Sequence, residues 1–143
     1  MSEAEGGFRV ALKAIVFKED GTILAMRRSD TAPSRPLGWD LPGGRLEYGE
    51  DATLGIQRET KEETGLIIET PIPFDVVART SDHNEFWVTI CYYARPTLYD
   101  VTLSYEHDKF KWTTPTEFKE MTTSTRQKQF AEKFEALQKS GKI

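Results

Sequence analysis

The first third of the chain carries two apolar runs separated by a short polar turn. Residues 8–17 and 23–26 are rich in Val, Ile, Leu and Phe, and the segment between them contains Glu19-Asp20-Gly21. Two apolar runs on either side of an Asp-Gly pair are typical of a β-hairpin. We therefore expect a hairpin at this point of the chain.

The middle of the chain predicts a helix followed by strands. Residues 51–64 contain no proline, and Gly65 can adopt the left-handed conformation that commonly ends a helix. Beyond it the pattern is strand-like. Strands are expected at 66–68, 74–80 and 86–94, with shorter ones at 101–103 and 110–112.

The C-terminal part predicts two helices. Thr114-Pro115-Thr116-Glu117 combines a capping threonine, an early proline and a glutamate at the third position, which marks a helix start. That helix should end near Met121. A second one is expected over residues 124–139, with an apolar stripe of Phe130, Phe134 and Leu137 packing on a sheet. The order of elements predicts an α+β fold, an α/β/α sandwich with a mixed sheet between helices.

Composition and charge narrow the function classes. The 143 residues suggest one domain over residues 1–143, and a net charge of −4 argues against nucleic acid or an anionic membrane as the main partner. The only cysteine, Cys91, alternates within an expected strand and is interpreted as a buried structural thiol. The acidic segment Met1–Gly7 shows neither a secretory signal nor a membrane span, so a cytoplasmic location is expected.

The expected helix at 51–64 carries the strongest chemical signal. At about 100° per residue, Glu59, Glu62 and Glu63 share one face, beside a packing stripe that includes Ile56 and Thr60. Like charges at this spacing cost about 0.2–0.5 kcal/mol per pair, and a cation would offset that cost. Mg²⁺ suits such oxygen ligands best, with Mn²⁺ as a substitute, whereas the sequence lacks the paired Cys and His spacings of zinc sites.

A plainer interpretation is a solvated acidic helix face with Arg58 and Lys61 as surface partners. This interpretation does not explain why the three glutamates crowd together. Nor does it explain the Leu41-Pro42-Gly43-Gly44 turn that leads into the helix, where two glycines allow a tight turn and an exposed carbonyl.

The segment from Gly44 to Leu66 resembles the Nudix box. Gly44 is followed after five residues by Glu50, and after seven more by Arg58-Glu59-Thr60-Lys61-Glu62-Glu63-Thr64-Gly65-Leu66. The one departure is Thr60, where the family usually has an aliphatic residue; we expect a small packing change and no loss of chemistry. The resemblance implies the Nudix sandwich fold and hydrolysis of a nucleoside diphosphate linked to another group X.

The resemblance also implies roles for individual residues. Glu59, Glu62 and Glu63 would be metal ligands, one of them doubling as general base, and Arg58 would orient a neighbouring glutamate. Glu50 would support the helix start or the outer metal shell, although an acidic residue at a helix N-terminus is also stabilising by itself. The carbonyl of Gly44 would help to hold the metal.

Further candidates lie outside the box. An additional acid is often supplied there in this family, and Glu106 is the first candidate and Glu85 the second. Arg28 and Arg35 are candidates for phosphate binding, with solubility as the alternative, and Trp39 for base stacking, with packing as the alternative. Both histidines, His83 and His107, are expected at the surface.

The sequence leaves the substrate open. The preferred hypothesis for the substrate is a nucleoside triphosphate or a small nucleoside diphosphate derivative. NDP-sugars or ADP-ribose are alternatives within the same family. A module that senses a nucleotide without cleaving it, and a scaffold whose acidic helix recruits a partner, are the hypotheses from other classes. The oligomeric state is left open, with a homodimer as one alternative.

Overall fold

The structure of the protein is a computed structural model that describes residues 7–143. Residues 1–6, on which most of the expectation about the N-terminal segment rests, lie outside the described residues. Within the described range, no helix is long and apolar enough to cross a membrane.

The strands form two sheets. The first is mixed, in the order β4-β1-β6-β5, because β1 runs parallel to β6 and the other pairs are antiparallel. The second is antiparallel, in the order β3-β2-β7. The bounds of the strands are β1 Arg9–Val16, β2 Ile23–Arg28, β3 Trp39–Asp40, β4 Gly43–Arg45, β5 Ile68–Thr80, β6 Phe86–Pro96 and β7 His107–Thr113.

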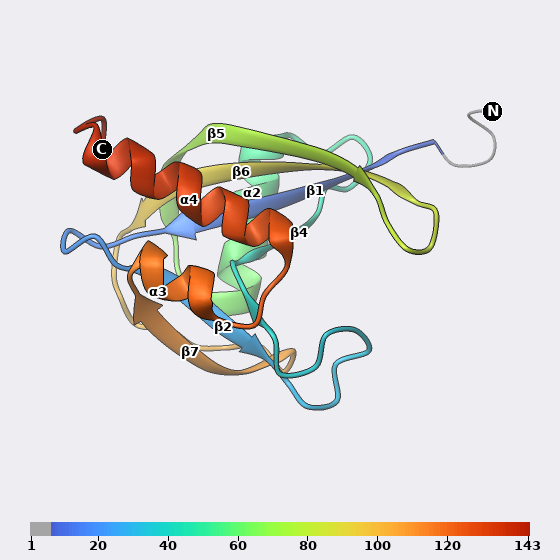
Figure 1. The fold of residues 1–143 in the computed structure, drawn as a ribbon, viewed down its shortest axis with the longest axis horizontal. Coiled ribbons are helices and arrows are strands. Elements are labelled where there is room, and N and C mark those ends of the chain that lie inside the picture. The colour runs from blue at the N-terminus through green and yellow to red at the C-terminus, as the bar shows by residue number, and fades with distance from the viewer. Residues whose placement is uncertain (1–6) are drawn as a thin grey trace.

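Helices cover both faces of the first sheet (Figure 1), and they are α2 Ala52–Thr64, α3 Pro115–Glu120 and α4 Thr125–Lys139. Strand β1 shows why the sequence folds this way, because its side chains alternate between the two faces. Leu12 packs in the same buried cluster as Ile56 of α2, whereas Ile15 packs with Phe130 and Phe134 of α4. The α+β sandwich expected from the order of elements is confirmed.

The expected helix boundaries are confirmed by their caps. The Asp51 side chain accepts a hydrogen bond from the Leu54 N–H at 3.0 Å, and α2 ends at Gly65 with φ +74°. Thr114 and Glu117 form the predicted capping box at the start of α3. Cys91 is fully buried, as expected, and burial raises the pKa of its thiol.

The hairpin expected from the first two apolar runs is wrong. The turn itself forms, with Gly21 at φ +87°, but β1 and β2 share only one antiparallel bridge, Phe17–Ile23, and belong to different sheets. The physical reason is that β6 pairs along the whole of one edge of β1 and β4 pairs with Ala11–Lys13 on the other, while β2 pairs with β3 and β7 instead.

Two smaller expectations about strands are also corrected. Of the strand expected at 66–68, only Ile68 is in a strand; it begins the edge strand β5, which also contains the run at 74–80. The prolines of β5 are tolerated because an edge strand needs fewer N–H donors. Residues 101–103 are not a strand. Instead, the Thr102 and Ser104 N–H groups donate to the Thr64 and Glu63 carbonyls, at 2.9 and 3.2 Å, and so satisfy the C-terminal end of α2.

Candidate active site

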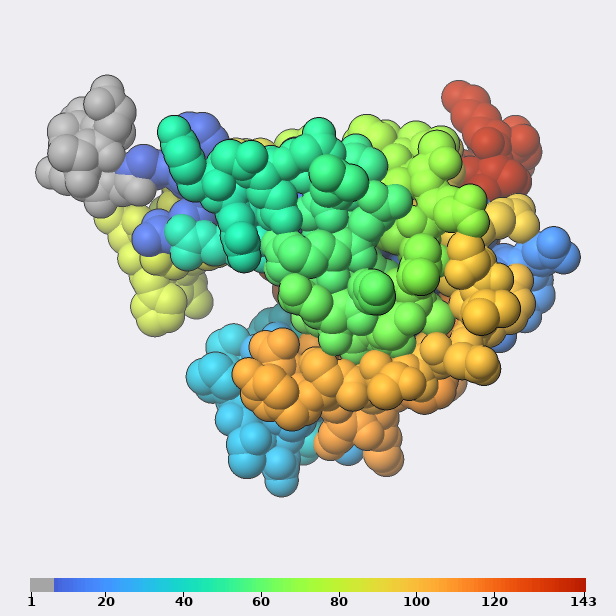
Figure 2. All heavy atoms as spheres, turned by 180° about the vertical axis from the view of Figure 1, so that it is seen from behind, coloured from blue at the N-terminus to red at the C-terminus, as the bar shows by residue number. Residues whose placement is uncertain are grey.

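A cleft of about 740 Å³ lies beside α2. In Figure 2 the surface is hollowed between α2 (green) and the segments around residues 30 (light blue) and 106 (orange). The acidic and basic groups that line this cleft come from several elements: Glu47, Glu59, Glu62, Glu63, Glu106 and Asp40, with Lys13, Arg28, Arg45, Arg58 and Arg126. The cleft therefore combines carboxylates with cations in one space.

Arg58 holds the carboxylates of the box in place. Its Nε and Nη2 atoms donate to the two oxygens of Glu50, at 2.7 and 3.0 Å. Its Nη1 atom donates to Glu59 at 2.9 Å and lies 3.3 Å from Glu62. Fork-shaped pairing of this kind fixes geometry as well as charge. Arg58 and Glu50 thus make the contacts that their expected orienting and supporting roles require.

Glu63 is a partly buried carboxylate whose charge is only partly compensated. It accepts a hydrogen bond from the Gly43 N–H at 2.8 Å. Burial raises its pKa to about 7; Lys13, this hydrogen bond and His107 oppose the rise, and Glu59 adds to it. Burial also raises the pKa of Glu59, despite its bond to Arg58. Both groups would be stabilised by a nearby cation.

The two glycines before the helix are needed for close approach. Strand β4 pairs with β1, and a Cβ at Gly43 would overlap the carbonyl oxygen of Leu12. A Cβ at Gly44 would overlap the carboxylate of Glu59. The backbone at Gly44 therefore lies against one of the candidate metal ligands, and the role of its carbonyl stays a prediction.

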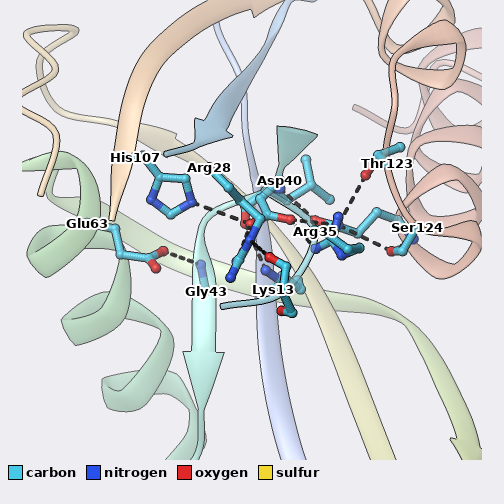
Figure 3. Close-up of polar contacts among 12 residues, drawn as sticks. Lys13, Arg28, Arg35, Asp40, Gly43, Glu63, His107, Thr123 and Ser124 are labelled. Carbon is cyan, nitrogen blue, oxygen red and sulfur yellow. Dashed lines mark hydrogen bonds and ion pairs between the residues drawn. The ribbon is translucent and has the colours of Figure 1, made fainter. Parts of the chain in front are cut away.

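A buried cluster around Asp40 forms another part of the cleft (Figure 3), and this cluster is not predicted from the sequence. Arg28 and Arg35 pair with the two Asp40 oxygens at 3.0 and 2.6 Å. The Gln127 amide donates to Asp40 at 3.1 Å, and His107 Nε2 lies 3.4 Å from it. Two nearby arginines and two side chains from distant parts of the chain thus surround one carboxylate.

The charge of Asp40 is strongly favoured. Burial works against it, but Lys13, His107 and Arg35 outweigh burial and hold the pKa of Asp40 well below its usual range. Lys13 itself donates to the Leu41 carbonyl at 3.0 Å and lines the cleft. A lone lysine within an apolar strand, and an aspartate between Trp39 and Leu41, are the signals by which sequence reasoning could have found these residues.

The expectation that both histidines lie at the surface is wrong for His107, which is only 6% exposed. His107 begins β7, where it pairs in register with Arg28 of β2, and its side chain reaches Asp40. His83 is exposed, as expected.

The other candidates lie in different places. Glu106 is exposed and lines the cleft, whereas Glu85 does not line it and pairs with Arg9 at 3.2 Å. Arg28 lines the cleft, and Arg35 lines a smaller hollow next to it. Trp39 packs against the hydrophobic cluster that includes Phe130 and Phe134 of α4, and it lines neither space. Its position matches the packing alternative.

The donor set fits a hard divalent cation, because the groups that would hold it are carboxylate and carbonyl oxygens. Within residues 7–143, no three Asp, Glu, His or Cys side chains converge closely enough to hold a metal ion. Arg58 explains this spacing, since it takes up oxygens of Glu50, Glu59 and Glu62. The residue types therefore suit Mg²⁺. The positions of Glu59 and Glu62 are those that pairing with Arg58 gives them.

This fold and glutamate-lined cleft are those of a Nudix hydrolase. The NUDIX domain family model matches residues 7–134, so the chain belongs to the Nudix family and is a hydrolase of that family. It is 33% identical over 111 residues to a MutT-like protein from Streptomyces ambofaciens, covering 78% of this chain and 67% of that protein.

Two further proteins are similar. An RNA pyrophosphohydrolase from Acidiphilium cryptum is 29% identical over 123 residues, covering 74% of this chain and 75% of that protein. The crystal structure of a MutT protein from Methanosarcina mazei superposes with a TM-score of 0.75 at 28% identity, covering 97% of this chain and 99% of that one. Members of the family generally use divalent metal cations.

Proposed function

We propose that the protein is a Mg²⁺-dependent pyrophosphohydrolase. It cleaves a nucleoside diphosphate linked to a group X by attack of water at phosphorus, and it releases a nucleoside monophosphate and phosphorylated X, or pyrophosphate from a triphosphate. The lead substrate is a nucleoside triphosphate or a small nucleoside diphosphate derivative. The observation that carries the proposal is the pair Glu59 and Glu63, partly buried in one cleft with raised pKa values and no cation sufficient to offset them.

The residues of the cleft divide the work. Glu59, Glu62, Glu63 and the Gly44 carbonyl would hold Mg²⁺, with Glu106 as a further ligand from outside the box. Mg²⁺, when bound, supplies charge neutralisation of a diphosphate and lowers the pKa of a bound water.

The chain's own groups bind the diphosphate and move the proton. Lys13 and Arg28 line the cleft and can contact phosphate oxygens, while Arg58 keeps Glu59 oriented. One of the three helix glutamates accepts the proton of the attacking water.

The names of the relatives support the same reaction class. The MutT-like and RNA pyrophosphohydrolase relatives are consistent with cleavage of a phosphoanhydride, and all three box glutamates are present in this chain. ADP-ribose and NDP-sugars are alternative substrates, and a nucleotide-sensing module is the non-catalytic alternative. A cytoplasmic location is part of the proposal, since the one cysteine is a free buried thiol.

The test is hydrolysis of a substrate panel in Mg²⁺. The panel contains NTPs, dNTPs, ADP-ribose, NDP-sugars, diadenosine polyphosphates and 5′-triphosphorylated RNA. Glu62→Gln and EDTA are the negative controls, and Glu132→Gln, an exposed glutamate on α4, is the matched surface control. Cleavage that is lost in Glu62→Gln and EDTA but kept in Glu132→Gln supports the proposal. Nucleotide binding without cleavage of any compound would favour the sensing module instead.

A further inference from the structure

A second hollow of about 250 Å³ adjoins the cleft at the start of α4. Ser81, Trp87 and Arg126 line both spaces, so the two form one continuous surface. Figure 3 shows Arg35 and Ser124, which line the second hollow, on the opposite side of Asp40 from Glu63. The cleft thus has an acidic end at α2 and an extension toward α4.

The extension is lined by three arginines, Arg35, Arg79 and Arg126, and its lining contains no Asp or Glu. Arg35 is paired with Asp40 at 2.6 Å. Within residues 7–143, the other two have no carboxylate within ion-pair distance. Arg79 only contacts the amide oxygen of Gln129, at 3.4 Å.

Arg126 is the most constrained of the three. Its Nη1 donates to the Thr89 hydroxyl at 2.8 Å, and its Nε is buried without a hydrogen-bond partner in the described part of the chain. Burial and the positive charge of Arg35 lower its pKa, the negative charge of Asp40 opposes the fall, and Arg79 adds to it. Repulsion among the three arginines and the buried N–H without an acceptor both cost free energy. Exposed, solvated arginines would not have this cost.

An anion in the hollow would remove that cost, because guanidinium groups match phosphate oxygens with paired, charge-assisted hydrogen bonds. Trp87 adds a partly exposed aromatic ring between the hollow and the cleft, suited to contact with a base or sugar. Aromatic and cationic groups together favour a phosphorylated nucleotide over a simple inorganic ion.

We infer that this hollow binds a second phosphate group of the substrate, separate from the diphosphate that is cleaved, which narrows the substrate from a plain nucleoside triphosphate to a nucleotide that carries a further phosphate. The inference rests on the proposed function, since it takes the diphosphate to lie in the glutamate-lined cleft. The second phosphate is either a monoester on the ribose of a small nucleotide or the first internucleotide phosphate of an RNA. Both present the same oxygens to Arg79 and Arg126.

The test is binding of AMP, adenosine 3′,5′-bisphosphate and the 5′-phosphorylated dinucleotide pApA to the intact protein, measured by calorimetry in Mg²⁺. None of them contains a phosphoanhydride, so binding is measured independently of hydrolysis. We expect at least one of the two larger ligands to bind about tenfold or more tightly than AMP, as one or two charge-assisted hydrogen bonds would give.

Variants locate the effect. Arg79→Gln, an exposed change outside the glutamate-lined cleft, and Arg126→Gln should each reduce the preference over AMP to about twofold or less; the affinity for AMP itself should be unchanged in Arg79→Gln. Arg126→Lys should restore part of it. Lys128→Gln, an exposed residue of α4 outside the hollow, removes the same charge and should keep the full preference.

The arms separate the alternatives. If only the bisphosphate binds more tightly than AMP, the hollow binds a ribose phosphate. If pApA also binds more tightly than AMP, the hollow accepts an internucleotide phosphate. Equal binding of all three ligands, or a preference that persists in Arg79→Gln and Arg126→Gln, would overturn the inference even if the substrate panel shows hydrolysis. Conversely, a failed panel with an intact preference would overturn the proposed hydrolase and leave the phosphate site standing.

Discussion

Two carboxylates of the same cleft, Asp40 and Glu63, have pKa values that are shifted in opposite directions. Burial disfavours the charged form of both Asp40 and Glu63. Asp40 nevertheless has its pKa held well below the usual range, whereas that of Glu63 is raised to about 7. The difference lies in the groups that surround each one.

Asp40 is surrounded by donors from its own chain, including Arg28, Arg35 and Gln127. Glu63 accepts one hydrogen bond, from the Gly43 N–H; Lys13 and His107 attract its charge without bonding to it, and Glu59 repels it. The compensated carboxylate acts as a structural anchor that positions arginines. Glu63, whose charge is less compensated, has oxygen lone pairs that accept no hydrogen bond from the described residues. A metal ligand requires such free lone pairs.

The largest expected effect comes from breaking the anchor. Asp40→Asn should lower the free energy of unfolding at pH 7 by about 2–3 kcal/mol, because it removes a buried charge that is hydrogen-bonded to two arginines, which themselves stay partly exposed to water. Urea unfolding measures this. Asp108→Asn is the matched control, since Asp108 pairs with Arg27 on the surface, and it should cost about 1 kcal/mol or less.

The pH dependence gives the sign of the Asp40 contribution. Since its folded-state pKa lies below the ordinary aspartate value of 3.8, the contribution is present above that pH and is lost as the pH falls further. The gap between wild type and Asp40→Asn should therefore narrow in strongly acidic solution. A gap that widens there would show that Asp40 is not held in its charged form.

Glu63→Gln should have the opposite effect on the metal-free protein. The folded state binds more protons than the unfolded chain between pH 4.5 and about 7, so the stability of the wild type falls as the pH rises through that window. At pH 8 the glutamine variant should be more stable than the wild type by about 1–3 kcal/mol, with little difference below pH 4.5. A variant that is less stable at pH 8 would mean that the chain itself compensates Glu63.

Arg58→Lys tests whether the hydrolysis rate depends on the orientation of the box glutamates. Lysine keeps the charge but cannot bond both oxygens of Glu50 while holding Glu59. We expect hydrolysis to fall by about 10–100-fold, as for other groups that orient metal ligands, with a small loss of stability. Arg95→Lys, an exposed change, should leave the rate unchanged; equal rates in both variants would exclude the orienting role.

The smallest effect concerns an uncharged pair on α2. The Thr60 hydroxyl is buried without a partner in the described residues, whereas that of Thr64 donates to the Thr60 carbonyl at 2.6 Å. Thr60→Val should raise the free energy of unfolding by about 1 kcal/mol and Thr64→Val should lower it by about the same. Thermal unfolding of both variants checks the signs, and a loss in Thr60→Val would contradict the assignment.

Local signals in the sequence were sufficient for the helices and the acidic half of the site. Asp51, Gly65 and Thr114 mark helix ends through hydrogen bonds a few residues away, and the box glutamates share a face because of helix periodicity alone. These interactions depend on sequence neighbours, so a pattern can reveal them.

The contacts that were missed join distant segments. His107 and Gln127 reach Asp40 across 67 and 87 residues, and nothing local to either residue indicates that partner. The hairpin between the first two apolar runs failed for a related reason. Strand pairing depends on which edges other strands already occupy, and β6, which fills one edge of β1, lies far along the chain.

The most direct test of the account is the shift in melting temperature caused by Mg²⁺ at pH 8 in the wild type, Asp40→Asn and Glu63→Gln. A ligand at 100 times its Kd stabilises the folded state by about 2.7 kcal/mol, which a melting curve resolves. The wild type and Asp40→Asn should both gain stability, although Asp40→Asn starts lower, and Glu63→Gln should gain little or none. An equal gain in Glu63→Gln and the wild type would contradict the claim that Glu63 is left uncompensated for a divalent cation.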